Sequence, residues 1–97
     1  MKTKKQYIEL LSNFQKTRGY AYGIYKMGIF GSVARGEQKD GSDVDIYYEG
    51  ESLSLFKMMA LKEELENILE NPVDIVRVRE SMNQLLKKRI KKDGLYV

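Results

Sequence analysis

Apolar positions along the chain repeat with two different spacings. Spacings of three and four residues place apolar side chains on one face of a helix, whereas alternation with a period of two is typical of a half-buried strand. In chain order, these spacings predict a helix at Thr3–Arg18, strands at Met27–Phe30 and Asp43–Glu49, a helix at Leu53–Leu69, a strand at Val73–Val78 and a last helix capped by Ser81.

This order of elements predicts an α/β (α+β) fold in which helices pack on a small sheet. A chain of 97 residues has room for one compact domain, which we expect to span residues 1–97. The polar run from Glu37 to Ser42 is predicted to be a loop, and the final Leu95–Val97 a short apolar tail.

The amino-acid composition restricts the chemistry that this chain can perform. It contains no cysteine and no histidine, which excludes disulfides, thiolate metal sites and every mechanism that needs an imidazole base or an imidazole zinc ligand. The groups that remain available for catalysis are carboxylates, hydroxyls, lysine, arginine and a metal ion held by oxygen atoms. No apolar run approaches the roughly 18 residues of a membrane span, so we expect a cytoplasmic protein that does not enter a membrane.

Positive charge is gathered near both ends of the chain. The net charge is only +3, but basic residues cluster at Lys2, Lys4 and Lys5 and again within Lys87–Lys92. These clusters either contact phosphates or form the solvated faces of helices. A basic nucleic-acid binder is the weakest functional hypothesis, because it accounts for none of the aspartates described below.

Two aspartates stand two residues apart in the predicted strand Asp43–Glu49. Side chains at this spacing leave the same face of a strand, so Asp43 and Asp45 are expected side by side. Adjacent carboxylates repel one another, and a divalent cation such as Mg²⁺, which prefers oxygen ligands, would relieve that repulsion. The alternative is a pair of solvated aspartates at the end of a strand, since an isolated D-x-D pattern is short.

A Gly-Ser turn follows the first predicted strand. Gly31 comes directly after Phe30, and glycine lets a backbone approach a ligand closely. The Ser32 hydroxyl and the N–H groups around it could hold a phosphate. An ordinary Gly-Ser turn, which is very common, explains the same two residues.

A third aspartate, Asp74, lies within an apolar run, where an unpaired charge is unfavourable. If its strand lies beside the strand Asp43–Glu49, three carboxylates converge. Two metal ions bound to them could then hold a triphosphate and activate an attacking hydroxyl. Alternatively, Asp74 forms a salt bridge with Arg77, Arg79 or Arg35.

Together these residues resemble the nucleotidyltransferase superfamily that is built like DNA polymerase beta. The pattern consists of Gly31-Ser32, ten intervening residues, the segment Asp43-Val44-Asp45-Ile46, and the later Asp74 in an apolar strand. The forms G-S-x-A-R-G at 31–36 and S-D-x-D-I at 42–46 resemble the minimal nucleotidyltransferase (MNT) branch of that superfamily. The resemblance covers about the whole chain.

The resemblance implies a mixed sheet flanked by helices, with a metal site at the sheet edge. It implies that Asp43 and Asp45 bind Mg²⁺, as one or two ions. It also implies that Asp74 is the third carboxylate and metal ligand, placed to assist removal of the proton from the acceptor hydroxyl.

The resemblance further implies that Gly31 and Ser32 contact the β- and γ-phosphates of a nucleoside triphosphate. Arg35 is expected either to touch phosphate or to pin the loop through a bridge to a carboxylate. Tyr47 shares the face of the aspartates and is expected either to lie at the surface or to stack on a base.

The activity that the resemblance implies is Mg²⁺-dependent transfer of a nucleoside monophosphate, in particular AMP from ATP, to a hydroxyl of a protein or another acceptor. Small members of this branch are often paired with a HEPN-type partner in toxin–antitoxin modules and can neutralise it by adding AMP. We expect no second domain that binds the acceptor, so the acceptor is itself a protein or is held by another protein or by a second copy of the chain. The alternative is a non-catalytic antitoxin that masks its partner by contact and keeps the motif as a nucleotide sensor.

Overall fold

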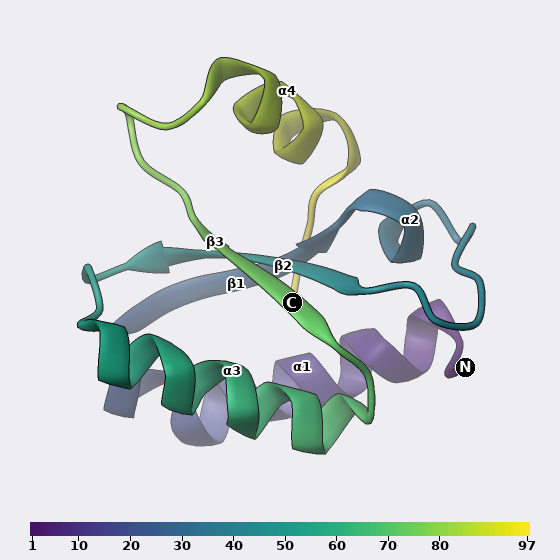
Figure 1. The fold of residues 1–97 in the computed structure, drawn as a ribbon, viewed down its shortest axis with the longest axis horizontal. Helices are drawn as coiled ribbons and strands as arrows, with labels where there is room; N and C mark the ends of the chain where they lie inside the picture. The colour runs from purple at the N-terminus through teal and green to yellow at the C-terminus, as the bar shows by residue number, and fades with distance from the viewer.

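The computed structural model describes all 97 residues, and its strands form one four-stranded sheet with helices on both faces (Figure 1). In chain order the elements are α1 (Lys4–Arg18), the 3₁₀ helix η1 (Gly19–Tyr22), β1 (Ile24–Phe30), α2 (Gly31–Ala34), β2 (Val44–Gly50), α3 (Leu55–Leu69), β3 (Val73–Arg77), α4 (Gln84–Asp93) and β4 (Leu95–Tyr96). The expected α/β (α+β) class, a small mixed sheet flanked by helices, is confirmed.

The sheet combines parallel and antiparallel neighbours in the order β3-β2-β1-β4. β1 runs antiparallel to both β2 and β4, whereas β2 and β3 are parallel. A parallel pair needs a long crossover connection, and α3 supplies it between the end of β2 and the start of β3. β3 and β4 are therefore the two edges of the sheet.

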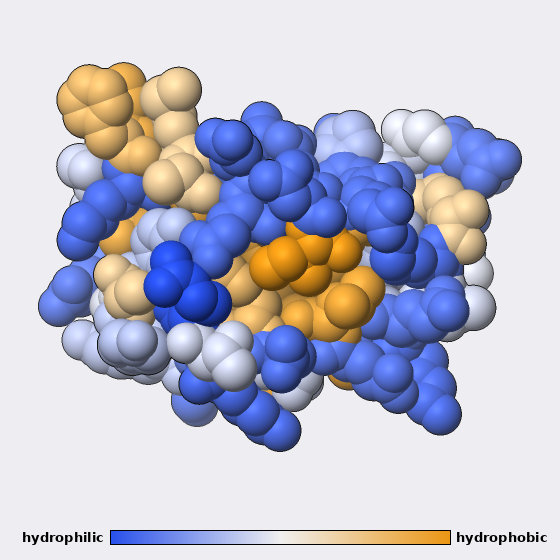
Figure 2. Space-filling model, turned by 90° about the horizontal axis from the view of Figure 1, so that it is seen from below, coloured by the Kyte–Doolittle hydropathy of each residue, from blue (hydrophilic) through white to orange (hydrophobic).

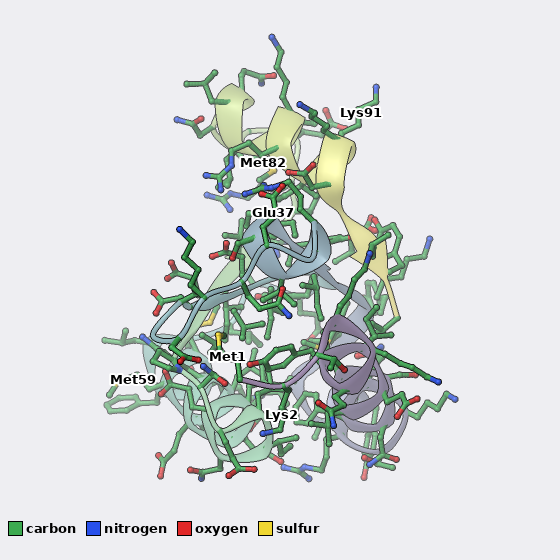
Figure 3. The ribbon with its side chains drawn as sticks, turned by 90° about the vertical axis from the view of Figure 1, so that its right-hand side faces the viewer. Met1, Lys2, Glu37, Met59, Met82 and Lys91 are labelled. Atoms are coloured by element: carbon green, nitrogen blue, oxygen red, sulfur yellow. The ribbon has the colours of Figure 1, made fainter.

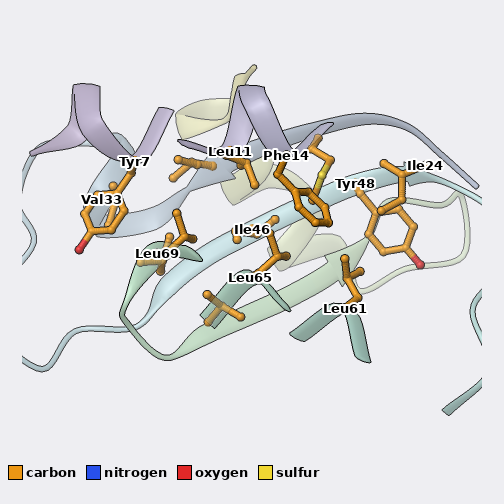
Figure 4. Packing of buried hydrophobic residues seen from close by; sticks show 14 of the residues in the cluster. Tyr7, Leu11, Phe14, Ile24, Val33, Ile46, Tyr48, Leu61, Leu65 and Leu69 are labelled. Carbon is orange, nitrogen blue, oxygen red and sulfur yellow. The ribbon is translucent and has the colours of Figure 1, made fainter. Parts of the chain in front are cut away.

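The helices α1 and α3 cover one face of the sheet, the lower one in Figure 1. Their buried side chains recur every three or four residues, as the sequence pattern predicts, and pack on the apolar positions of β2 (Figure 4). In α3 these residues are Leu61, Leu65 and Leu69. Sixteen buried residues form this main core, and burial of each large apolar side chain contributes roughly 1.5–3 kcal/mol.

The outer surface of α1 and α3 is mostly polar. Seen from this side, hydrophilic side chains surround a strip of apolar groups (Figure 2). Partly buried residues such as Ile8, Leu10 and Ile68 pack against the main core from the same two helices. None of the helices is both long enough and apolar enough to cross a bilayer.

The opposite face of the sheet is covered only in part, by α4, which stands above it in Figure 1. Here four buried residues, Phe30, Tyr47, Met82 and Ile90, form a second, smaller cluster. Because this cover is short, the rest of the face stays open to a ligand.

The start of α4 differs from the prediction. Ser81 does not cap the helix; the Asn83 side chain does, by accepting hydrogen bonds from the backbone N–H groups of Leu85 and Leu86. Asparagine is as good an N-cap as serine, so composition could not distinguish the two positions. Leu85, in the first turn of this helix, points outward, and its side chain is 73% exposed.

One strand is longer than predicted, and another was not predicted as a strand. β1 begins at Ile24 rather than Met27, and the expected tail is the edge strand β4, whose Leu95 and Tyr96 pair with Ile29 and Gly28. A two-residue strand is too short to carry a periodic signal, and it forms because β1 offers a free edge.

Candidate active site

Asp45 and Asp74 lie next to each other on two parallel strands. In the register of β2 and β3, Val44 pairs with Val73 and Asp45 with Asp74. Both valines are buried in the main core. Since side chains alternate along a strand, the two aspartates point to the opposite face, which α4 covers in part.

Asp43 immediately precedes β2 and is exposed, as is Asp74, whereas Asp45 is half-buried. As the side chains stand, no three acidic groups come together closely enough to hold a metal ion. The backbone nevertheless brings all three aspartates to one end of the β2–β3 pair.

The surroundings of Asp45 disfavour its charged form. Burial, followed by the negative charge of Asp74, raises the pKa of the Asp45 carboxyl, and the charge of Asp43 adds to this effect. Arg89 and, more weakly, Arg35 act in the opposite direction. Three carboxylates and two arginines are therefore close enough to act on one another electrostatically.

Gly31 connects the Gly-Ser turn to this group. Its φ angle of +72° lies in the left-handed region, and a Cβ atom at this position would collide with the Asp45 carboxylate. Ser32 follows within α2 and is partly buried, and its carbonyl oxygen accepts a hydrogen bond of 2.8 Å from the Glu37 N–H. The Gly-Ser turn and Asp45, which are distant in sequence, are thus in direct contact.

Arg35 is held by two carboxylates. Its Nε donates to Glu37 Oε2 at 3.1 Å and its Nη1 to Asp93 Oδ2 at 2.9 Å. Asp93 ends α4, so this arginine ties α2 to the helix above it; Figure 3 shows Glu37 on the side of α2 that faces α4. Of the two expected roles, the structure has the bridge to carboxylates, and a contact with phosphate stays a prediction.

Tyr47 is buried, which contradicts both of its expected roles. Its side chain is 1% exposed, and its ring packs edge-on against Phe30 and Tyr96 at centroid distances of 6.0 Å and 5.2 Å. Gly28 on the neighbouring strand leaves room for this ring, because a Cβ atom there would overlap it. A glycine inside a strand often marks such a close approach, and it was the signal in the sequence. Burial raises the pKa of the Tyr47 phenol to about 12, so the phenol is neutral at physiological pH.

Two residues near the aspartates were given no role at the site from the sequence. Asp93 is the second partner of Arg35, and Arg89 lies 5.8 Å from the centroid of the Phe30 ring, measured from its guanidinium carbon. Arg89 belongs to the basic cluster within Lys87–Lys92, whose charge pattern alone does not say which member faces the sheet.

The largest groove of the molecule, about 530 Å³, is separate from the three aspartates. It follows the edge strand β3 between the starts of α3 and α4, and its lining includes Leu53, Ile75, Arg77 and Leu86. The candidate site is therefore an open surface beside α2 and not an enclosed cavity.

Residues 5–97 match the family described as Polymerase beta, Nucleotidyltransferase. The chain belongs to this family. The resemblance seen in the sequence motifs is thereby confirmed, and the chain is an enzyme-family member over almost its entire length. A relative, the protein adenylyltransferase MntA of Thermococcus cleftensis, is 35% identical over 98 residues, which cover 100% of this chain and 98% of the relative.

Solved structures of toxin–antitoxin complexes contain chains with the same fold. One is a toxin–antitoxin complex with AMP-PNP, with a TM-score of 0.71 at 24% identity, covering 96% of this chain and 70% of the other. Another is the tri-AMPylated Shewanella oneidensis HEPN toxin in complex with its MNT antitoxin, with a TM-score of 0.67 at 21% identity, covering 94% of this chain and 70% of the other. At these identities the likeness concerns the fold alone.

Proposed function

We propose that this nucleotidyltransferase moves AMP from ATP, in the presence of Mg²⁺, to a hydroxyl group of a HEPN-type protein and thereby acts as the antitoxin of a toxin–antitoxin pair. One observation carries the catalytic part of this proposal: Asp45 and Asp74 pair across β2 and β3, and Gly31 packs against the Asp45 carboxylate. The Gly-Ser turn and an acidic pair thereby lie together on one open face of the sheet, which supports a role of the turn in binding phosphate.

The residues fit a divalent cation of the magnesium type. Asp43, Asp45 and Asp74 would hold it through carboxylate oxygens, which Mg²⁺ prefers, while it retains several waters. Burial, and after it the negative charges of Asp74 and Asp43, raise the pKa of the Asp45 carboxyl, and a bound cation would favour its charged form. When bound, the metal supplies charge neutralisation at the triphosphate and acidifies the attacking hydroxyl.

The protein groups have separate tasks in the transfer. Gly31 and Ser32 hold the β- and γ-phosphates, which leaves the α-phosphorus beside the aspartates. The acceptor oxygen forms a bond to the α-phosphorus, the bond to the oxygen that bridges the α- and β-phosphates breaks, and pyrophosphate leaves with the electron pair. Asp74, which is exposed at the edge strand, accepts the proton of the acceptor hydroxyl and passes it to solvent.

Support for a protein acceptor comes from the relatives. The Thermococcus cleftensis relative is named a protein adenylyltransferase, and a structural neighbour is an MNT antitoxin bound to an AMPylated HEPN toxin. The exposed position of Asp74 suits this acceptor class, because a side chain of a docked protein can reach an edge strand without entering a cavity.

The test combines the purified chain, ATP labelled in its α-phosphate, Mg²⁺ and a HEPN-type protein from the same organism. We expect label on the partner, a mass increase that corresponds to AMP, and release of pyrophosphate. Asp74→Asn should bind ATP about as well as the wild type but transfer AMP slowly, since a group that receives a proton from the acceptor acts mainly in the transition state.

Glu63→Gln is the matched control, because it removes an exposed carboxylate from α3 on the other side of the sheet. It should leave both binding and transfer unchanged. Full-strength transfer by Asp74→Asn would remove the proposed role of the third carboxylate. If ATP binds and no AMP reaches any partner, the protein is a non-catalytic nucleotide-binding antitoxin.

A further inference from the structure

Two arginines, Arg35 at the end of α2 and Arg89 over the Phe30 ring, lie near the Gly-Ser turn, and they differ in what else they contact. Arg35 is engaged with Glu37 and Asp93. Arg89 is exposed and takes part in none of the ion pairs of the chain. One arginine is thus occupied in holding helices together, and the other has its hydrogen-bond donors free.

The position of Arg89 is set by its helix and by an aromatic ring. It precedes Ile90, whose side chain anchors α4 in the second cluster. Its guanidinium carbon lies 5.8 Å from the centroid of Phe30, which is itself buried and pairs with Asp45 across β1 and β2. A cation over an aromatic face is held in place without losing its donors, and this aromatic residue directly precedes Gly31.

We propose that Arg89 is a phosphate-binding residue of the active site, which holds the β- and γ-phosphates of the nucleoside triphosphate and the pyrophosphate that leaves. This inference rests on the proposed nucleotidyl transfer and assigns one further residue to it. The guanidinium is a planar fork that matches phosphate oxygens, and it lies over Phe30, the residue that directly precedes the Gly-Ser turn.

The role of Arg89 also has an electrostatic basis. Its guanidinium lies over Phe30, the residue that pairs with Asp45 across β1 and β2, whereas the guanidinium of Arg35 is paired with Glu37 and Asp93. When the bond to the α-phosphorus breaks, negative charge grows on the leaving pyrophosphate. A fixed cation at that position stabilises the charge as it develops.

Arg89→Gln is the informative change, and Lys88→Gln is its control. Both remove one positive charge from the exposed part of α4 at adjacent positions, so a general loss of positive potential affects both. Binding of ATP, of inorganic pyrophosphate and of AMP is measured by titration calorimetry with Mg²⁺ present. Thermal unfolding of each variant shows that it is folded.

We expect Arg89→Gln to weaken ATP and pyrophosphate binding by about 10-fold or more, as for loss of a charged hydrogen bond, and to leave AMP binding unchanged. The affinity of Arg89→Lys for ATP and pyrophosphate should lie between those of Arg89→Gln and the wild type. The affinity of Lys88→Gln should equal that of the wild type. AMP transfer by Arg89→Gln should fall at saturating ATP as well, because the contact strengthens as pyrophosphate leaves.

Three outcomes would overturn this inference. Arg89→Gln could bind ATP as tightly as Lys88→Gln does, or it could lose AMP binding to the same extent as ATP binding, which would assign Arg89 to another part of the nucleotide. Arg89→Gln could also fail to fold while Arg89→Lys binds ATP as the wild type does, which would make the residue structural. If the wild-type chain itself binds no ATP, the proposed function fails and takes this inference with it.

Discussion

The two faces of the sheet are built from the same strands but serve different ends. On one face α1 and α3 bury sixteen residues in a continuous core, whereas on the other α4 buries four. β2 takes part in both, since Val44 and Ile46 point into the main core while Asp45 and Tyr47 point to the opposite face. Alternate residues of one strand can therefore have different tasks: some stabilise the core, and those between them face the candidate site.

The incomplete cover of the second face has a functional consequence. α4 packs over Tyr47 and Phe30 and leaves Asp45 half-buried and Asp74 exposed. A helix that covered this face fully would exclude the nucleotide and the acceptor of the proposed reaction. Because few side chains are buried on this face, it contributes little to stability. For the same reason the candidate site stays accessible.

The largest effect that we expect separates activity from stability. Asp45→Asn should reduce the rate of AMP transfer roughly a thousand-fold, because a charged metal ligand is lost. This factor corresponds to a loss of several kcal/mol of transition-state stabilisation. Its free energy of unfolding should not fall, because the charged carboxylate is unfavourable in the folded protein. Transfer assays together with urea unfolding measure both quantities, and a strongly destabilised variant would break the distinction between the faces.

A core substitution should produce the reverse pattern. Leu65→Ala removes a fully buried side chain from the main core and should lower the free energy of unfolding by about 3 kcal/mol. Ile90→Ala, on the other face, should cost about 2 kcal/mol or less, since its cluster is small and the side chain is 9% exposed. Urea unfolding compares the two, and an equal or larger loss for Ile90→Ala would contradict the view that α4 adds little stability.

A change in the Gly-Ser turn should affect binding alone. Ser32→Ala should weaken ATP binding by about 1–3 kcal/mol, the contribution of a hydrogen bond to a charged group, and leave thermal stability nearly unchanged. Ser81→Ala, at an exposed serine outside the site, is the control. Isothermal titration with ATP distinguishes them, and equal affinity for the two variants would remove Ser32 from the phosphate site.

The tie between α2 and α4 should have a smaller effect. Arg35→Gln loses ion pairs with Glu37 and Asp93, and we expect a decrease in stability below that of Ile90→Ala, because exposed ion pairs contribute little. The double variant Arg35→Gln/Asp93→Asn should lose less than the sum of the two single changes. Additive losses would show that the pair does not couple the helices.

The smallest effect is a pH dependence at Asp45. The pKa of its carboxyl is raised in the folded protein. At low pH the group is protonated in both the folded and the unfolded state, so it does not reduce the free energy of unfolding. As pH rises from the ordinary aspartate pKa through the raised value, the unfolded chain releases its proton first and the folded state loses stability relative to Asp45→Asn. Urea unfolding of both proteins between acid and neutral pH measures the difference, and a difference that moves the other way contradicts the cause given for the shift.

Much of the local structure follows from the sequence. Helical spacing predicts α1 and α3, and the first predicted helix begins at Thr3, whose side chain forms a capping box with Gln6. Alternation in β2 assigns Asp45 to the face opposite Ile46. These features depend only on residues up to four positions apart in the sequence. The period of a helix or a strand determines how such residues lie relative to one another. The motif of Gly31, Ser32 and the aspartates likewise indicates the family from the order and spacing of its residues alone.

The tertiary structure alone decided which distant residues meet. It paired Asp74 with Asp45 rather than with an arginine, and it made Leu95 and Tyr96 an edge strand. It also buried Tyr47 over Gly28 and brought Arg89 above Phe30, while Arg35 bridged to Asp93. None of these contacts repeats with a helical or strand period, because each depends on strand order, register and the packing of α4. A sequence determines which residues can form a site of this kind, and the path of the chain between them determines which of them do.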